Sequence, residues 1–145
     1  MPHVITRTVC AAGVDAVWAK LKDIESYPTY MTVVRSVEIE RELSDGRRIS
    51  SWSVLLKGSV LEWREEEVVD EASRTLSFEQ LDGDMDVFSG QWRVTAESGG
   101  TVITMEATFD IGIPLLAEML NPVAEKALRD SCVQIASAVG AQAHA

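Results

Sequence analysis

The 145-residue sequence contains only two histidines, His3 and His144, which stand at opposite ends of the chain. A Ser-His-Asp or Cys-His catalytic centre needs a histidine beside its nucleophile, so this placement argues against both. The two cysteines, Cys10 and Cys132, are far apart and are expected to be free buried thiols. No cysteine–histidine cluster has metal-site spacing, and no glycine-rich phosphate loop occurs. We therefore expect neither a metal nor a cofactor.

Basic residues are scarce, with 13 lysines and arginines against 23 aspartates and glutamates and a net charge of −10. Such a charge repels phosphate groups and anionic lipids, which argues against nucleic-acid and membrane-surface partners. No uninterrupted apolar run approaches the roughly 20 residues of a membrane span, and the first residues lack the apolar core of a signal peptide. We expect a cytoplasmic protein without stable membrane insertion.

The composition is that of a globular protein, with 46% hydrophobic and 25% charged residues. There is no internal repeat, low-complexity stretch or linker, and the length is about that of one ordinary domain. We therefore expect a single domain covering residues 1–145.

The hydrophobic pattern predicts a strand, two helical segments, six further strands and a long helix. His3–Cys10 is rich in β-branched residues, helical spacing follows over 14–21, and 26–31 can form one or two helical turns. A period of two begins at Val33, and sequences such as Asp-Gly and Gly-Gly between the alternating runs predict tight turns. The six predicted strands are Val33–Leu43, Arg48–Leu56, Ser59–Val69, Thr75–Leu81, Asp86–Ala96 and Thr101–Ile111.

The C-terminal part is predicted to be helical, because apolar residues recur every three or four positions from Leu116 to Val139. At Asn121-Pro122 either a short helix gives way to a longer one, Pro122–Val139, or one helix kinks. The longer helix, roughly 27 Å in length, can cross a sheet. The fold class is therefore α+β: a seven-stranded curved antiparallel sheet wrapped around a long C-terminal helix, with two short helices after the first strand. A pocket between sheet and helix follows from that arrangement.

Several motifs in this order resemble the START-like (SRPBCC) superfamily, which includes polyketide cyclases and coenzyme Q-binding proteins. The resemblance covers nearly the whole chain. Residues 23–28 (Asp-Ile-Glu-Ser-Tyr-Pro) resemble the segment after the first helix, and residues 34–38 (Val-Arg-Ser-Val-Glu) the start of the second strand. Residues 62–63 (Glu-Trp) and 90–94 (Gly-Gln-Trp-Arg-Val) resemble cyclase-type middle strands. The resemblance implies a helix-grip, ligand-binding domain with an internal apolar cavity.

Strand parity places large aromatic side chains on the faces that we take as concave and helix-facing. These are Trp52, Trp63, Phe78, Phe88 and Trp92. A ligand cavity accommodates several indoles more easily than a solid core, although an ordinary aromatic core is the alternative. Further candidate ligand contacts are Val54 and Met105 on the same faces, Leu116 and Leu120 (with Ala124) from the C-terminal helix, and Arg35 at the pocket mouth.

Glu65 is the first candidate catalytic residue, because it shares the Trp63 face of its strand. A carboxyl buried there can exchange protons with a ligand, since burial moves its pKa towards neutrality. The alternative is that residues 65–67, all glutamates, leave the pocket as a solvated acidic run. We favour that alternative for Glu67 and, less strongly, for Glu65.

Three further residues are candidates for polar contacts with a ligand in the pocket. Gln80 lies on the Phe78 face and can contact a carbonyl or hydroxyl group. The resemblance places the segment with Tyr27 and Tyr30 over the cavity entrance, where these residues can gate the pocket or donate their hydroxyls. Packing of both tyrosines against the first helix is the alternative.

The resemblance implies a polyketide cyclase, aromatase or dehydratase-like protein that binds a hydrophobic aromatic or polyketide intermediate. If it is an enzyme, it is of the lyase or isomerase type, in the setting of antibiotic biosynthesis. The alternative is a non-catalytic carrier or chaperone of a quinone or lipid, and the residues leave the two readings nearly level. Aromatase-type members often carry an arginine where this chain has Glu67 and a late histidine near Ala107-Thr108. The expected partner is a hydrophobic small molecule, with delivery by an acyl carrier protein as an option, and the chain is expected to be a monomer or homodimer.

Overall fold

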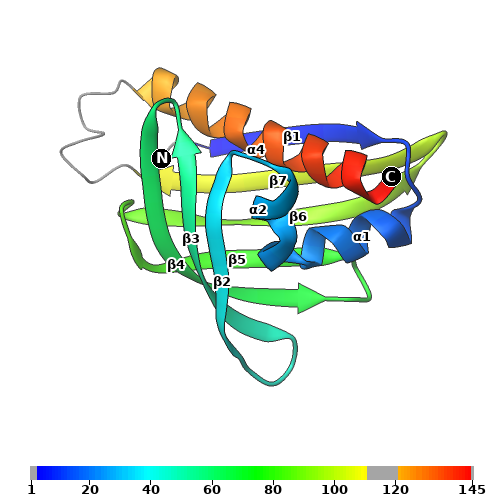
Figure 1. Ribbon diagram of the computed structural model, residues 1–145, viewed down its shortest axis with the longest axis horizontal. Helices are drawn as coiled ribbons and strands as arrows, with labels where there is room; N and C mark the ends of the chain where they lie inside the picture. The colour runs from blue at the N-terminus through cyan, green and yellow to red at the C-terminus, as the bar shows by residue number, and fades with distance from the viewer. Residues whose placement is uncertain (1–2, 111–120, 145) are drawn as a thin grey trace.

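The computed structural model of the protein describes residues 3–110 and 121–144. One antiparallel sheet of seven strands, in the order β1-β7-β6-β5-β4-β3-β2, curves around a long helix (Figure 1). The strands are β1 (His3–Cys10), β2 (Val34–Glu42), β3 (Arg47–Leu56), β4 (Ser59–Asp70), β5 (Thr75–Gly83), β6 (Val87–Glu97) and β7 (Gly100–Asp110). The helices are α1 (Val14–Lys22), the short 3-10 turn η1 (Ile24–Ser26), α2 (Tyr27–Tyr30) and α4 (Asn121–His144). The predicted helix-grip class is confirmed.

The predicted boundaries differ from the observed ones mainly at β5 and α4. β5 continues to Gly83 rather than ending at Leu81, so the expected turn at 82–84 begins inside the strand. α4 starts at Asn121 and runs to His144, five residues beyond the predicted end at Val139. The short helix expected before Asn121 lies outside the described residues.

The core lies between the concave face of the sheet and α4, because strand parity directs alternate side chains towards the helix. Met105 and Ile103 of β7 are wholly buried there, as are Ala136 and Val139 of α4. Two buried clusters share Trp63 and Trp92 at their boundary. Among the described residues, no helix is long and apolar enough to cross a membrane.

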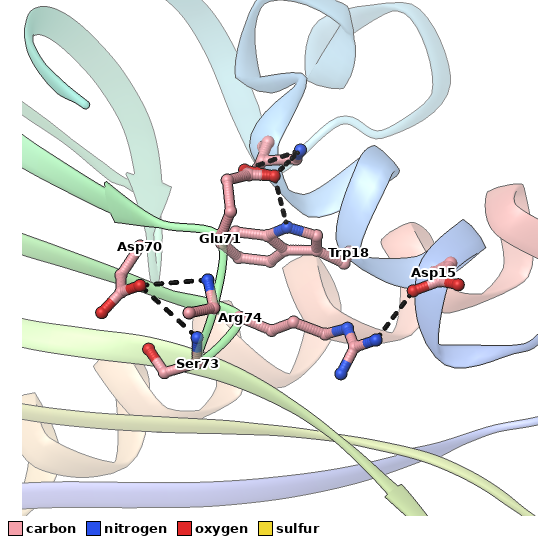
Figure 2. A network of polar contacts seen from close by, with 8 residues as sticks. Asp15, Trp18, Asp70, Glu71, Ser73 and Arg74 are labelled. Carbon is pink, nitrogen blue, oxygen red and sulfur yellow. Dashed lines mark hydrogen bonds and ion pairs between the residues drawn. The ribbon is translucent and has the colours of Figure 1, made fainter. Parts of the chain in front are cut away.

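A polar network fastens α1 to the turn between β4 and β5 (Figure 2). The Trp18 indole Nε1 donates to Glu71 Oε1 at 3.1 Å, and Lys22 Nζ donates to the same carboxylate at 2.7 Å. On the other side of the turn, Arg74 donates to Asp15 at 2.9 Å. These contacts hold α1 at one end of the sheet and give the buried Trp18 indole a hydrogen-bond partner.

Candidate functional site

An internal cavity of about 50 Å³ lies between the sheet and α4. It is lined by all five predicted aromatics, by Val54 and Met105, by Tyr27 and Glu65, and by residues that the sequence analysis did not single out. Those additional residues are Leu21, Ile24, Leu76, Leu128, Ser131, Cys132 and Ile135. An engineered apolar cavity that binds benzene has a volume of roughly 150 Å³. An aromatic ligand therefore enters this cavity only if lining side chains move apart.

The aromatic side chains also contact one another. The two alternatives drawn from the sequence, a ligand cavity and an ordinary aromatic core, therefore both hold in part. Trp52 and Trp63 stack with ring centroids 5.8 Å apart and planes 1° from parallel. The Phe88 ring meets Trp63 edge-on at 5.3 Å and lies 4.9 Å from Phe78. Tyr27 completes the row with its centroid 6.0 Å from that of Trp52. The result is a continuous aromatic wall with a small void beside it.

A bulge and a glycine set the position of Trp63. The register between β4 and β5 shifts between Arg64 and Glu65, which leaves Trp63 opposite Gly83. Gly83 has φ +150°, and a Cβ there would lie 2.4 Å from the Trp63 Cβ. Only glycine fits that approach without displacing the indole.

A buried polar array lies next to this wall, on the same face of β3 and β4. Glu67 is wholly buried, and its Oε1 accepts from Arg48 Nε at 2.6 Å. Its Oε2 accepts from the Ser50 hydroxyl at 2.9 Å, and that hydroxyl accepts from the Trp52 indole at 2.8 Å. The expectation that Glu67 reaches solvent is therefore wrong. The strand remains inside the sheet at this point, and Arg48, directly opposite in the register, neutralises the carboxylate.

Glu65 is also buried, with 4% of its surface exposed, and it lines the cavity. Its Oε1 accepts from the Trp63 indole at 2.7 Å. Burial raises the pKa of Glu65 well above its ordinary value, and the adjacent Glu67 raises it further by hydrogen bonding and by charge. The Trp63 hydrogen bond and the Arg48 charge oppose that rise in pKa. Burial and the neighbouring Glu67 together favour the protonated form of Glu65 on the cavity wall.

The two tyrosines have different environments. The Tyr27 ring lines the cavity, but its hydroxyl donates to the Leu21 carbonyl at 2.5 Å, and burial raises its pKa well above the ordinary value. Tyr30 is half-buried, packs edge-on against Tyr27 at 6.2 Å and does not line the cavity. Burial raises the pKa of Tyr30 to about 12. The Tyr27 hydroxyl is therefore committed to the backbone, and Tyr30 belongs to the packing of α2.

Gln80 and Arg35 are not part of the cavity wall. Gln80 Nε2 donates to the Met85 carbonyl at 2.6 Å, which fixes the β5–β6 connection. Arg35 is exposed, because a bulge between Val34 and Ser36 interrupts the alternation on which its expected position depended. The candidates Leu116 and Leu120 lie outside the described residues, and Ala124 is buried in the core without lining the cavity.

Sequence reasoning missed Arg48 and Ser50, which complete the polar array. A usable signal was present, because both residues share the parity of Trp52 on β3. The contributions of α4 are harder to find, since a helical stripe alone does not say which of its residues border a void. Within the described part of the chain, no group of three His, Cys, Asp or Glu side chains is placed to hold a metal ion.

A curved antiparallel sheet closed by one long helix, with an aromatic-lined cavity between them, defines a helix-grip domain of the START-like type. The chain belongs to the polyketide cyclase/dehydrase and lipid transport family, whose sequence model matches residues 10–131.

Solved structures show the same fold at low sequence identity. The protein TTHA0849 from Thermus thermophilus is 24% identical with a TM-score of 0.89, and the match covers 99% of this chain and 97% of that one. The Zhui aromatase/cyclase from Streptomyces sp. R1128 is 23% identical with a TM-score of 0.82, over 99% and 93% of the two chains. A START superfamily protein from Mycobacterium smegmatis is 15% identical with a TM-score of 0.82, over 98% and 97%. Among the curated proteins, none matches this chain significantly.

Proposed function

We propose that this protein binds a hydrophobic aromatic or polyketide intermediate in its cavity and promotes cyclisation or dehydration of it. The observation that carries this proposal is Glu65, a buried carboxyl on the wall of a largely aromatic and aliphatic cavity, where burial raises its pKa. Membership of the polyketide cyclase/dehydrase and lipid transport family supports it. The fold likeness to an aromatase/cyclase is consistent with it, but at 23% identity concerns the fold alone.

The cavity supplies confinement, and Glu65 supplies the proton. An apolar wall holds a flexible chain in few conformations, which brings reacting carbons together. In a dehydration, Glu65 protonates the departing hydroxyl, which leaves as water. The Glu65 carboxylate then takes the proton released from the adjacent carbon, so that the carboxyl returns to its neutral form. A raised pKa suits this exchange near neutral pH.

The direct test supplies the purified protein to a minimal polyketide synthase that makes a poly-β-ketone chain, with products followed by mass spectrometry. We expect the wild-type protein to raise the share of cyclised, dehydrated product. Glu65→Gln keeps the shape of the side chain and removes its proton donor, so turnover should fall roughly 10²–10⁴-fold, the usual contribution of a general acid–base. Glu66→Gln, on the outer face of the same strand, is the matched control. An unchanged rate in Glu65→Gln contradicts the catalytic proposal.

A non-catalytic carrier of a hydrophobic molecule is the second candidate. It is favoured by the fact that Tyr27 and Ser131, the hydroxyl-bearing side chains of the cavity wall, already donate to backbone carbonyls. For a carrier, Glu65→Gln should leave ligand binding and transfer nearly unchanged.

Binding itself is measured by tryptophan fluorescence with a neutral aromatic probe such as 2-naphthol. We expect quenching, because Trp52, Trp63 and Trp92 line the cavity. Trp63→Phe and Trp92→Phe should each reduce the quenching. Trp18→Phe is the control, since the Trp18 indole on α1 is hydrogen-bonded to Glu71 in the β4–β5 turn and does not line the cavity. Equal quenching in all variants would place the ligand elsewhere.

A further inference from the structure

The array formed by Arg48, Glu65 and Glu67 contains one cation and two carboxyls in a buried environment. We propose that the Arg48–Glu67 pair is a positioning device that holds one proton on Glu65 by charge balance. The acid role of Glu65 rests on the proposed function, whereas the location of the proton does not. Arg48 and Glu67 do not line the cavity, so they act on a ligand only through Glu65.

Burial makes the net charge of this array important. The exposed fractions of Arg48, Glu65 and Glu67 are 8%, 4% and 0%. An uncompensated charge in such a place is costly, so the groups exchange protons with water until the net charge is close to zero. One guanidinium compensates one carboxylate. The other carboxyl must then keep its proton.

The hydrogen bonds decide which carboxyl keeps the proton. Glu67 accepts from a guanidinium at 2.6 Å and from a hydroxyl at 2.9 Å, one at each oxygen, which is the environment of a carboxylate. Within the described residues, Glu65 accepts only from the neutral Trp63 indole. A neutral Glu65 can also donate to Glu67, and that hydrogen bond raises its pKa. The negative charge therefore belongs to Glu67 and the proton to Glu65.

The other titratable groups near the array do not change this balance of charges. Tyr27 from α2 lies within the electrostatic influence of both Glu67 and Arg48, and burial keeps its phenol neutral by raising its pKa. Cys132 from α4 lines the same cavity, and burial raises the pKa of its thiol to about 12. On β5, the residue opposite Glu67 is Phe78, which carries no charge. The balance is thus set by Arg48 and the two glutamates.

Charge balance has a chemical consequence at the cavity wall. When Glu65 gives its proton to a ligand, the array is left with two carboxylates and one cation. That imbalance drives Glu65 to recover a proton, which returns the site to its starting state. A Glu65 without Glu67 beside it would pair with Arg48 as a carboxylate and would act as a base instead of an acid.

Two substitutions separate this proposal from burial acting alone. In Glu67→Gln the array has one cation and one carboxyl, so Glu65 should ionise and its pKa should fall by roughly 1–3 pH units, the effect of a close opposite charge. In Arg48→Met the cation is gone, so Glu65 should keep its proton and Glu67 should take one up at neutral pH. The number of buried protonated carboxyls should therefore be one in the wild type, none in Glu67→Gln and two in Arg48→Met. If burial alone sets the state of Glu65, it stays protonated in all three proteins.

The readout is an NMR titration of the glutamate side-chain carboxyl carbons, with Glu65→Gln to assign the Glu65 signal and Glu66→Gln as control. A Glu65 pKa that stays at its wild-type value in Glu67→Gln overturns the proposal. The number of protonated buried carboxyls in Arg48→Met is an independent check. A single protonated carboxyl in that variant also overturns the proposal. If the titrations move as expected while Glu67→Gln cyclises the poly-β-ketone like the wild type, the charge balance stands and the acid role of Glu65 fails.

Discussion

The raised pKa of Glu65 makes a quantitative prediction about the stability of the fold at different pH values. In the folded protein the pKa of this carboxyl lies well above its ordinary value, and in the unfolded chain it returns to about 4.3. Between these two values the folded state holds a proton that the unfolded state releases. The associated stabilisation is fully present below the unfolded pKa and is lost as the pH rises through the folded pKa. Within that window, Glu65 lowers the free energy of unfolding by about 1.4 kcal/mol for each pH unit.

Glu65→Gln removes this slope, because a glutamine side chain does not titrate. At pH 5 the neutral acid and the amide should be nearly equivalent, since both can donate to Glu67. As the pH rises above 5, the variant should gain about 1.4 kcal/mol per pH unit relative to the wild type, until the pH passes the folded pKa of Glu65. A destabilising effect of the native residue at neutral pH is what a functional, rather than a structural, carboxyl would show.

The assay is urea denaturation of both proteins at several pH values, with the difference in unfolding free energy plotted against pH. Taking the difference removes the contributions of titrating groups that do not interact with Glu65. Glu66→Gln controls for the loss of one glutamate from the same strand. A difference between Glu65→Gln and wild type that does not change with pH would refute the raised pKa, and with it the assignment of Glu65 as the neutral acid.

Three further outcomes follow from the packing. Gly90→Ala should destabilise the protein by about 1–3 kcal/mol in urea denaturation, because its Cβ would lie 2.0 Å from the Glu106 carbonyl oxygen on β7; an effect near zero contradicts the close approach of these strands. The Cys132 thiol, with its pKa raised to about 12 by burial, should react with a thiol reagent at neutral pH only when the chain is unfolded, and fast labelling of the native protein contradicts its burial. Ile135→Ala should enlarge the cavity at a cost of about 2–5 kcal/mol and tighten 2-naphthol binding, whereas weaker binding would mean that the ligand does not occupy the cavity.

The sequence was sufficient to predict the fold because its elements have strong local signals. Alternation along β3 to β7 gave the faces of those strands correctly, and the helical stripe gave α4. All five aromatic residues of the predicted wall line the cavity. The face on which a side chain lies can be predicted wherever the strand is regular, since the side-chain period of a strand is fixed by its geometry.

The errors have two physical causes. Arg35 was misplaced because a bulge in β2 shifts the alternation by one residue, and a bulge has no reliable signal in a single sequence. Glu67 was assigned to solvent because it stands in a run of three glutamates. Its true environment depends on Arg48, 19 positions earlier in the chain, and that pairing follows only from the register of β3 against β4.

The pairing of Arg48 with Glu67 also explains what replaces the arginine of the aromatase-type relatives that this sequence resembles. An arginine at that position, as the resemblance implies for those members, would place a cation on the same face of β4 as Trp63. Here the guanidinium comes from β3 and is neutralised by Glu67 itself, while the group that lines the cavity is the uncharged Glu65. An uncharged acid cannot stabilise an enolate as a cation does, but it can protonate a carbonyl or a departing hydroxyl. If Glu65 acts as proposed, the site is therefore better suited to steps that begin with proton donation, such as dehydration, than to steps that depend on an accumulated enolate.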